Sequence, residues 1–493
     1  MSDKNISDVS RIRRKVYRKL VELVIEDQLV EKINSLPYKI IEEETTKHRC
    51  CEYKERAIIE ERIKLSLGFV PSRHPHTPLS DLAIKVKNNK INESPVRVIK
   101  TACDGCPIDR YSVTDACRNC VAHKCINICP RDAIDFIRGR AYIDQDKCIE
   151  CGLCKKACPY DAIHENTRPC VQVCNVDAIK ADKYGVAHID HEKCINCGKC
   201  INACPFGAID NLSSIVQVMM ELNKKRENVI ALLAPSFLGQ FGPGITPRRI
   251  NRALKLAGFY EIYEVAEGAD MVIHEEAEEF IERKNTGEDF MTSSCCPAFK
   301  SFVEKEFPNL SRNISDALSP MVKIAKKIKR KNPNFKTVFI GPCVAKKNEG
   351  NYHKEIDYVL TFEELISLIV GNNFNLRNME DGQKIKGASA LGRSFAISGG
   401  VARGIETYLQ KEKKINKNYD FCTGRGLDDC REKLEKLKEG KYNIDFMEGM
   451  ACDKGCISGP GNLIKDIKAK KQVEDFASKA ENEIPFYQLQ SLS

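Results

Sequence analysis

The stretch Glu448-Gly-Met-Ala-Cys452-Asp-Lys-Gly-Cys456-Ile-Ser-Gly-Pro-Gly461 places two cysteines four residues apart in a glycine-rich loop, just after the strand-like run Tyr442-Asn-Ile-Asp-Phe-Met447. Two other strand-like runs lead into Gly341-Pro-Cys343-Val-Ala-Lys346 and Thr292-Ser-Ser-Cys295-Cys296-Pro297. A fourth run, beginning at Val229, ends at Pro235-Ser236. Loops at the carboxyl ends of strands in α/β domains converge on one crevice. Five cysteines would meet there, enough to hold a metal cluster and leave one thiol over.

These three cysteine loops resemble the signature motifs of iron-only (FeFe) hydrogenases, which run roughly TSCCP, PCxxK and ExMACxxGC. In that family four cysteines bind a 4Fe–4S cluster, and one of them bridges to a two-iron subcluster carrying CO and cyanide; together these form the H-cluster. Carried over by motif position, the resemblance implies the ligands Cys296, Cys343, Cys452 and Cys456, with Cys456 as the bridge. The alternative is a set of buried, unreactive cysteines, since free Cys is common in protein cores.

The resemblance also implies roles for residues around the cluster. Lys346 matches the lysine that donates to one cyanide, a sensible pairing of an ammonium with an anionic ligand. Pro235 and Ser236 match the loop that contacts the other cyanide through a backbone N–H and a hydroxyl, and Met450 matches a methionine that packs on the two-iron unit. A solvated surface lysine and an ordinary core methionine are the alternative interpretations.

A proton path is implied by the same resemblance. Glu276 and Glu279 stand three residues apart, so they share one face of a helix. Ser315 takes the family's serine position, and Cys295 is the thiol that the cluster leaves over. These four residues would carry protons between the two-iron unit and solvent; the alternative for the two glutamates is an exposed acidic helix.

Some positions depart from the better-known family pattern. Phe299 stands where Trp is usual, Gly341 where Met is usual and Met321 where Gln is usual, and the last loop has Gly459-Pro-Gly461 in place of a glycine triplet. Such changes alter the surroundings that tune a cluster's potential. They bear on rate and catalytic bias more than on cofactor binding, and they indicate a divergent subgroup.

Cysteine repeats organise residues 103–204. Three full repeats have three closely spaced cysteines and a fourth followed by proline, and a half-repeat spans residues 170–174; each is followed by an x-Asp/Gly-Ala-Ile tail. The repeats resemble bacterial-type ferredoxins, in which three thiolates of one loop hold a cubane and the fourth, placed by its proline at a helix start, ligates the neighbouring cluster. The alternative, zinc, usually takes two separated Cys-x-x-Cys pairs.

Because fourth ligands are exchanged between repeats, the ligand sets can be assigned. The first two repeats would form clusters with Cys117, Cys120, Cys125 and Cys158, and with Cys148, Cys151, Cys154 and Cys129; the third would use Cys194, Cys197, Cys200 and Cys174. Cys170 and Cys204 then need two partners, which Cys103 and Cys106 can supply. We therefore predict about four additional 4Fe–4S clusters. Three clusters are the alternative, and His164 could compete as a ligand.

Composition bounds the class of protein. The 493 residues include 25 cysteines and carry a formal net charge of +9. No apolar signal segment follows Met1, so we expect a cytoplasmic protein, and in a reducing compartment dense cysteine indicates metal rather than disulfides. No apolar run reaches the ~20 residues of a membrane span. Neither a reading motif nor the aromatic interleaving typical of nucleic-acid binding is present.

Residues 1–100 predict helices joined by loops, without evident chemistry. The three-and-four spacing of one helix face is kept by Ile12, Val16, Leu20, Leu23 and Val24. The adjacent Cys50 and Cys51 could ligate metal, but an adjacent pair without partners more often has no such role, and Cys422 and Cys430 match no motif and are predicted to be structural.

The alternation of strand-like and helix-like segments over residues 212–493 predicts an α/β domain of parallel sheets flanked by helices. The resemblance implies that this is a two-lobed hydrogenase catalytic domain. An α+β ferredoxin-like domain over residues 101–211 and an N-terminal helical region over residues 1–100 precede it. One helix start is predicted in detail, with Thr361 as N-cap and Glu364 as its capping-box partner.

The predicted function is reversible oxidation of dihydrogen and reduction of protons at the H-cluster. Expected partners are ferredoxin or a similar electron carrier, and hydrogenase maturation proteins. No flavin or nicotinamide fingerprint is evident, so NAD(P)H would need a separate subunit. Two alternatives stay open: a sensory or low-turnover hydrogenase homologue, and a non-catalytic iron–sulfur electron-transfer or assembly protein.

Overall fold

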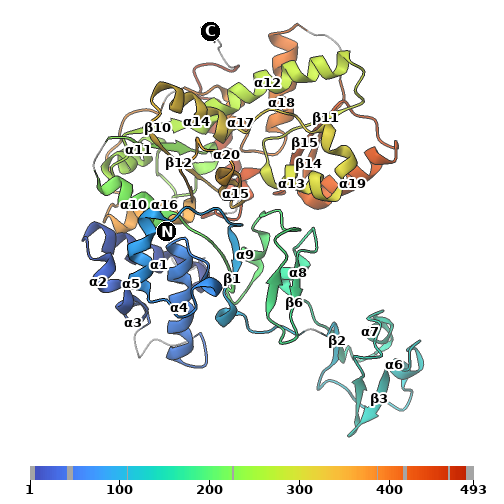
Figure 1. Ribbon diagram of the computed structural model, residues 1–493. Helices are drawn as coiled ribbons and strands as arrows, with labels where there is room; N and C mark the ends of the chain where they lie inside the picture. Colours follow the sequence, from blue (N-terminus) through green and yellow to red (C-terminus); the bar gives the residue numbers. More distant parts are fainter. Residues whose placement is uncertain are drawn as a thin grey trace.

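The computed structural model describes residues 6–41, 48–107, 109–224, 227–385, 387–414, 419–464 and 467–484. Figure 1 shows N-terminal helices at the lower left, small strand pairs at the lower right, and sheets flanked by helices above them. The predicted fold class is confirmed: parallel sheets with helices follow a helical region and a small α+β region. Among the described residues, no helix is long and apolar enough to cross a membrane.

The N-terminal helices are part of the main core. In α1 (Asp8–Ile25) the predicted apolar face is confirmed, because Val16, Leu20, Leu23 and Val24 are buried. The other helices here are α2 (Leu29–Lys32), α3 (Leu36–Ile40), α4 (Glu52–Ser66) and α5 (Leu79–Lys85). One continuous apolar cluster joins the buried face of α1 to α10 (Ile215–Asn223) and α16 (Phe362–Gly371). These helices therefore pack as a layer of the lobe that follows.

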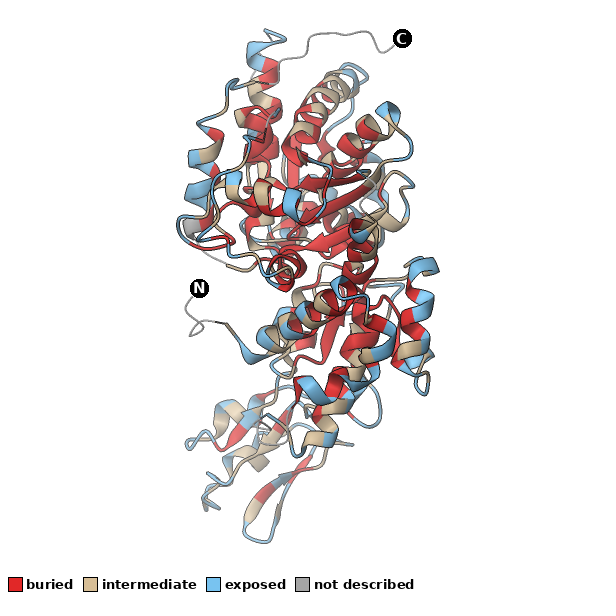
Figure 2. Ribbon diagram, turned by 90° about the vertical axis from the view of Figure 1, so that its left-hand side faces the viewer, coloured by how far each residue is buried: buried red, intermediate tan, exposed pale blue. Residues whose placement is uncertain are grey.

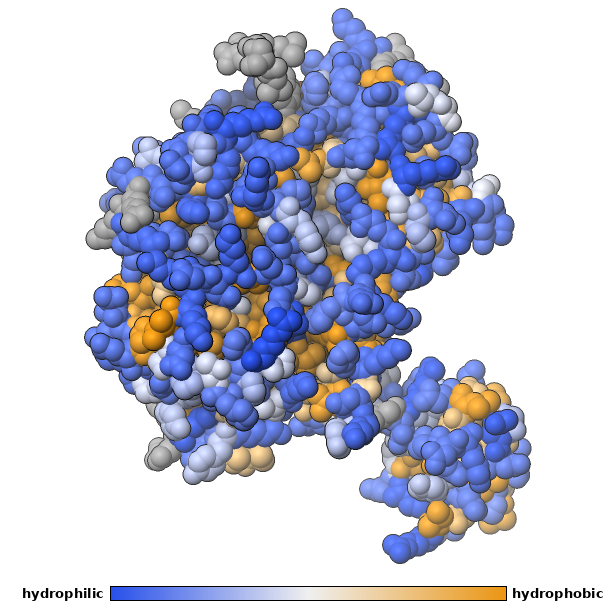
Figure 3. Space-filling model, in the orientation of Figure 1, coloured by the Kyte–Doolittle hydropathy of each residue, from blue (hydrophilic) through white to orange (hydrophobic). Residues whose placement is uncertain are grey.

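Residues 96–211 form antiparallel strand pairs with short helices. The pairs are β1 (Val96–Val98) with β8 (Ile209–Asn211), β2 (Tyr111–Val113) with β5 (Ile163–Glu165), β3 (Ile134–Ile137) with β4 (Arg140–Ile143), and β6 (Ile179–Ala181) with β7 (Ala187–Ile189). The helices are α6 (Lys124–Asn127), α7 (Leu153–Ala157), α8 (Pro169–Gln172) and α9 (Lys199–Ala203). The part that holds α6 and α7 projects from the body, and the space-filling view shows it set apart (Figures 1 and 3).

The tail shared by the repeats has a structural basis. The residue before its Ala takes the left-handed conformation, with φ of 49° at Asp132, 47° at Asp161, 46° at Asp177 and 61° at Gly207. Gly, Asn and Asp tolerate this conformation best. The next residue, Ala, then donates its N–H to the fourth cysteine sulfur of its repeat at 3.3–3.4 Å. The tail thus holds each fourth cysteine and turns the chain into a strand.

The prediction that proline places the fourth cysteine at a helix start is wrong. The helices α7 and α9 end just before Cys158 and Cys204, and the prolines that follow lie in turns. Both cysteines have extended backbone, with ψ of 114° and 111°. The ring of a proline disfavours the helical conformation for the residue before it, so the helix stops there.

A four-stranded parallel sheet forms the core of one lobe. Its order is β10 (Glu261–Glu264), β9 (Val229–Leu233), β12 (Lys336–Gly341) and β13 (Tyr358–Thr361). It packs with α10 and α16 and with α11 (Pro247–Leu256), α14 (Pro320–Lys331) and α15 (Ala345–Asn351). The predicted capping box is confirmed: Thr361 and Glu364 exchange hydrogen bonds at the start of α16.

A three-stranded parallel sheet forms the second lobe. Its order is β11 (Met291–Thr292), β15 (Phe446–Met450) and β14 (Phe421–Arg425). The associated helices are α12 (Val265–Asn285), α13 (Pro297–Glu306), α17 (Ala390–Ser394), α18 (Gly400–Lys411) and α19 (Leu427–Lys438). The last helix, α20 (Ile467–Ala477), contacts α17 and places Ala469 and Val473 in the core of the four-stranded lobe. Figure 2 shows burial concentrated in the sheets and the inner helix faces, and far less of it in the projecting part.

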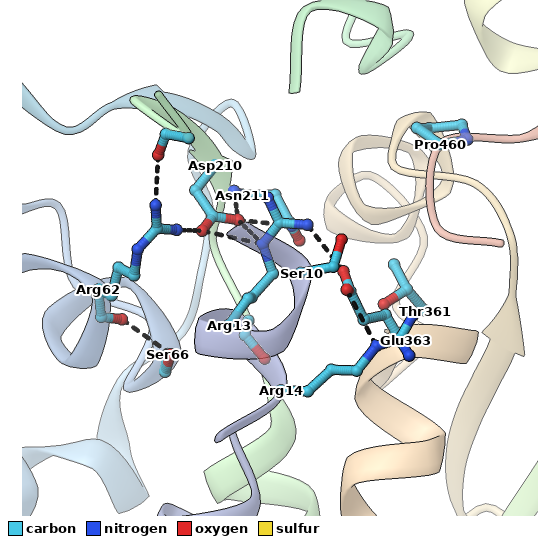
Figure 4. A network of polar contacts seen from close by, with 12 residues as sticks. Ser10, Arg13, Arg14, Arg62, Ser66, Asp210, Asn211, Thr361, Glu363 and Pro460 are labelled. Carbon is cyan, nitrogen blue, oxygen red and sulfur yellow. Dashed lines mark hydrogen bonds and ion pairs between the residues drawn. The ribbon is translucent and has the colours of Figure 1, made fainter. Parts of the chain in front are cut away.

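A buried charge network ties the N-terminal helices to the rest of the chain (Figure 4). Arg13 of α1 lies 3.1 Å from the Asp210 carboxylate and 2.8 Å from that of Glu363 on α16. Arg62 of α4 pairs with the same Asp210 and donates to the Gly207 carbonyl. The network therefore joins the helical region, the strand-pair region and the four-stranded lobe.

Candidate active site

The carboxyl ends of strands from both sheets deliver the predicted site loops. Cys343 follows β12, Cys295 and Cys296 follow β11, and Cys452 and Cys456 follow β15. The loop that begins at residue 234 follows β9. Because these strands run parallel to their neighbours, each sheet presents its loops at one edge.

A cavity of about 90 Å³ is lined by residues from all four loops. Every residue predicted to surround a two-iron unit lines it: Pro235, Ser236, Cys295, Lys346, Met450 and Cys456. Cys296 and Cys343 line it as well. The structure therefore brings together residues that lie more than 200 positions apart in the sequence.

The four predicted cluster ligands lie close together, and each is partly buried. Burial raises the pKa of Cys343 and of Cys456 to about 12. Burial also raises the pKa of Cys452, and the neighbouring Cys343, Cys296 and Cys456 raise it further. Free thiols here would be hard to ionise, whereas a bound metal stabilises the thiolate. The arrangement suits a metal cluster better than reactive free cysteines.

Two polar side chains line the same cavity. Lys346 donates to the Cys295 carbonyl at 3.3 Å and to Glu349 at 2.6 Å. Burial alone would lower the pKa of Lys346, but Glu349 turns the net shift upward, so the ammonium stays charged. Within the described part of the chain, the buried Ser236 hydroxyl has no hydrogen-bond partner. A buried hydroxyl without a partner costs free energy, which a ligand atom accepting its hydrogen bond would offset.

The predicted carboxylates lie on α12, on the Cys295 side of the cavity. Glu276 is fully buried, and its Oε1 accepts hydrogen bonds from the Ser294 N–H at 3.0 Å and the Ser294 hydroxyl at 3.2 Å. Burial raises the pKa of Glu276 to about 7. Burial raises the pKa of Cys295 as well, and Glu276 is the largest further cause, so the two groups are neighbours. The sequence reasoning missed Ser294, although it belongs to the TSCCP motif.

The outer carboxylate leads toward solvent. Glu279 accepts a hydrogen bond from the Ser315 hydroxyl at 2.7 Å and forms an ion pair with Arg283 at 2.7 Å. Arg283 also lies 3.1 Å from Asp316, whose side chain is 94% exposed. No sequence signal singled out Arg283, which lies one turn after Glu279 and forms ion pairs with both Glu279 and the exposed Asp316.

The cysteines of the predicted relay set nearest the active site lie close together. Burial raises the pKa of Cys200, and Cys197, Cys194 and Cys174 raise it further, which places this set together. Cys197 also contributes to the raised pKa of Cys452, after burial and the nearer thiols. This relay set therefore lies beside the predicted active-site cluster.

The cysteines proposed for the fourth relay cluster, whose ligand set the sequence leaves least certain, also lie near one another. Burial is the largest cause of the raised pKa of Cys170. The neighbouring Cys204 raises it further, and Cys106 does so more weakly. Cys103 and Cys204 pack against the apolar cluster that contains Cys170. The competing residue His164 has an exposed side chain in β5, which pairs with β2. The geometry favours Cys103 and Cys106 as the missing partners.

The projecting part carries the remaining two sets. Burial raises the pKa of Cys125, with further contributions from Cys120 and Cys158, as the exchange of fourth ligands requires. Around one small apolar cluster lie Cys117, Cys125, Cys129, Cys148, Cys154 and Cys158. Within the described residues, no group of three His, Cys, Asp or Glu side chains is arranged to hold a single metal ion.

Comparison with known proteins gives the family. Residues 227–460 match the family described as "Iron only hydrogenase large subunit, C-terminal domain". This part of the chain belongs to the iron-only hydrogenase family. Residues 141–164 match a 4Fe-4S binding domain and residues 165–215 the LdpA Fe-S cluster-binding domain, so 4Fe–4S-binding domains precede the hydrogenase-family domain.

Several known proteins are similar to this chain at low identity. The chain is 29% identical to iron hydrogenase 1 of Clostridium pasteurianum over 413 residues, covering 70% of this chain and 69% of that one. It is 28% identical to the periplasmic Fe hydrogenase large subunit of Nitratidesulfovibrio vulgaris, covering 68% and 87%. The cytosolic Fe-S cluster assembly factor narfl of Danio rerio is 24% identical, covering 45% and 67%. Among solved structures, apo FeFe-hydrogenase HydA1 from Chlamydomonas reinhardtii has a TM-score of 0.46 at 20% identity, covering 56% and 91%.

The residues that depart from the usual iron-only hydrogenase pattern fit closely against their neighbours. A Cβ built on Gly341 would lie 2.6 Å from ring atoms of Phe339, so that ring fills the space where the family usually has Met. Phe339 and Met321 both line the cavity. Phe299 is fully buried against Gly449, where a Cβ would lie 2.2 Å from its ring. The cavity wall therefore differs from the usual pattern at Met321 and beside Gly341, whereas the four motif cysteines are all present.

Proposed function

We propose that this member of the iron-only hydrogenase family catalyses reversible oxidation of dihydrogen and reduction of protons at an H-cluster. The observation that carries the proposal is the lining of the cavity of about 90 Å³. It joins motif cysteines to the buried ammonium of Lys346 and the partnerless hydroxyl of Ser236. Such a donor set suits thiolate-bound iron with anionic ligands.

The residues present fit that cofactor. The cubane ligands would be Cys296, Cys343, Cys452 and Cys456. Cys456 lines the cavity and would bridge to the two-iron unit. Lys346 and Ser236 would donate to its anionic ligands, with Pro235 shaping the loop and Met450 covering one side. When bound, the group supplies low-valent metal chemistry that no side chain offers.

The chain's own contribution to the reaction would be proton transfer. Cys295 lines the cavity, and Glu276 behind it has a pKa of about 7 because it is buried. A group with that pKa can both accept and release a proton near neutral pH. Glu279, hydrogen-bonded to Ser315, would continue the path toward Arg283 and solvent.

Electrons would travel through the relay sets. Cys197 contributes to the raised pKa of Cys452, which supports the inner set as the last relay before the active site. The projecting part, with the two outer sets, would meet ferredoxin or a similar carrier. We further propose that the protein is cytoplasmic and that maturation proteins insert its cofactor. The proposed domains are the helical region at residues 1–100, the ferredoxin-like domain at residues 101–211 and the catalytic domain at residues 212–493.

Anaerobic maturation of the chain tests the function. The expected result is hydrogen evolution from a reduced dye, together with infrared bands of CO and cyanide in the same sample. Bands without turnover would refute the catalytic proposal and favour a sensory or low-turnover homologue. Iron without such bands or turnover would favour a non-catalytic electron-transfer or assembly protein.

Each of the two alternative functions, an assembly protein and a low-turnover homologue, is supported by an observation. Assembly factors are similar to 39–45% of this chain. The altered cavity wall at Gly341 and Met321 favours a low-turnover homologue, since changes around a metal site tune its reactivity. The presence of Cys295 and of all four cubane ligands favours the hydrogenase.

The iron content tests the predicted relay. The matured chain is expected to bind about 22 irons, from four relay cubanes, an active-site cubane and two further irons. Cys103→Ala should lower the content by about four irons, because it removes one ligand of a four-cysteine set. Cys422→Ala, at a non-ligand thiol, is the control. A wild-type content near ~18 irons that Cys103→Ala leaves unchanged would exclude this relay cluster.

The proton path predicts the effect of Cys295→Ala. Turnover in dye-linked hydrogen evolution should fall by a factor of about one hundred or more, because alanine cannot transfer a proton. The infrared bands should persist, since Cys295 is not a cluster ligand in the proposal. Cys295→Asp, which can still carry a proton, should recover part of the rate. Turnover near the wild-type value in Cys295→Ala would contradict the relay role.

A further inference from the structure

Two adjacent cysteines stand outside every predicted cluster. Cys50 and Cys51 are both exposed, and their sulfurs lie 3.7 Å apart. They immediately precede α4, a helix of 15 residues in which Cys51 is the N-cap. Two solvent-accessible thiols almost in contact are an arrangement that can change covalently.

The helix makes the two thiols unequal. Cys51 has extended backbone, with φ of −163° and ψ of 161°, which places it ahead of the first turn. The first-turn N–H groups of Lys54 and Tyr53, together with the neighbouring Cys50 thiol, lower the pKa of Cys51. Helix N-termini favour negative charge, and the thiolate is the nucleophilic form of cysteine. Glu52, the nearest acid in the sequence, opposes this shift only weakly.

We propose that Cys51 is a peroxide-reactive cysteine and that Cys50 is its resolving thiol. The Cys51 thiolate attacks hydrogen peroxide, forming an S–O bond, breaking the O–O bond and releasing hydroxide. The Cys50 thiol then attacks the sulfur of the resulting sulfenic acid, expelling water as the S–S bond forms. Two thiols are oxidised by two electrons, and one peroxide is reduced to two waters after proton transfer.

The disulfide between Cys50 and Cys51 would be easy to reduce. Cα atoms of neighbouring residues are about 3.8 Å apart across a trans peptide, below the usual range for disulfides. Strain of this kind makes a disulfide easier to reduce, which is typical of labile and regulatory bonds.

The location connects this pair to the relay. Arg49, next to Cys50, donates to the Ala102 carbonyl at 3.3 Å and to the Phe206 carbonyl at 2.8 Å. Lys54 and Arg49 each lie 3.8 Å from Asp104. Asp104 stands between Cys103 and Cys106. The modification would therefore form beside this loop, although the chemistry proposed does not depend on a cluster there.

Thiol mapping of the anaerobically matured protein tests the proposal. Brief iodoacetamide treatment followed by peptide mass spectrometry should label Cys51 roughly threefold or more faster than Cys50, because a higher thiolate fraction outweighs the loss of nucleophilicity. Equimolar hydrogen peroxide should convert the pair to a disulfide that dithiothreitol reverses. Equal labelling of the two residues, or no disulfide, overturns the assignment.

Variants separate the two roles. In Cys50→Ser, peroxide should leave a sulfenic acid on Cys51 that dimedone traps, because no resolving thiol remains. In Cys51→Ser, Cys50 should stay unoxidised under the same conditions. Cys422→Ser, which alters a non-ligand thiol elsewhere, should behave as the parent protein. Dimedone labelling of Cys50 in Cys51→Ser, at the parent rate, would reverse the assignment and sink the proposal.

Discussion

The Cys456→Ala variant is expected to lose the two-iron subcluster and with it all hydrogen turnover. Cys456 is the one proposed covalent link between the chain and that unit, and its side chain lines the cavity. Lys346 and Ser236 would still face the cavity, but hydrogen bonds alone do not replace an iron–sulfur bond. The relay clusters should survive, because their cysteines belong to other loops.

Infrared and electron paramagnetic resonance spectra of the same sample check this result. The CO and cyanide bands should disappear while the signals of reduced relay clusters remain. Cys430→Ala provides a control, since Cys430 is a buried cysteine of the three-stranded lobe that matches no motif. Retained CO and cyanide bands in Cys456→Ala would mean that another residue forms the bridge.

The Asp210→Ala variant is expected to lower the free energy of unfolding by about 3–5 kcal/mol, because it leaves buried arginines without their shared partner. Asp210 is 3% exposed and pairs with both Arg13 and Arg62. Burial alone would raise the pKa of Asp210, but the two guanidinium groups lower it below its ordinary value. Its contribution is therefore fully present above about pH 4 and is lost as the pH falls below that.

Urea unfolding of the matured protein, followed by circular dichroism, measures the change. Glu432→Ala is the control, because its ion pair with Lys436 is exposed and should contribute no more than about 0.5 kcal/mol. Replacing the whole group with apolar residues should cost less than Asp210→Ala, since the penalty comes from the unpaired charges. A loss below about 1 kcal/mol for Asp210→Ala would show that solvent reaches the network.

The sequence by itself determined the features that depend on near neighbours in the chain. Thiolate spacing predicts the relay ligand sets, and Cys170 and Cys200 each have thiols of their predicted set as neighbours. The α1 face and the capping box at Thr361 were predictable for the same reason, since helix periodicity and caps are local. The prediction that the fourth cysteine of each repeat lies at a helix start was wrong for a local reason as well, because proline disfavours the helical conformation for the residue before it.

Only the tertiary structure decided which distant groups meet. The two sheets bring Ser236, Cys295 and Cys456 to one cavity, and no spacing in the chain encodes a contact across 200 residues. The same holds for Phe339, whose ring fills the space above Gly341, and for the burial that raises the pKa of Glu276. Packing between separate elements sets these distances and the exclusion of water, and those two quantities determine what the side chains can do.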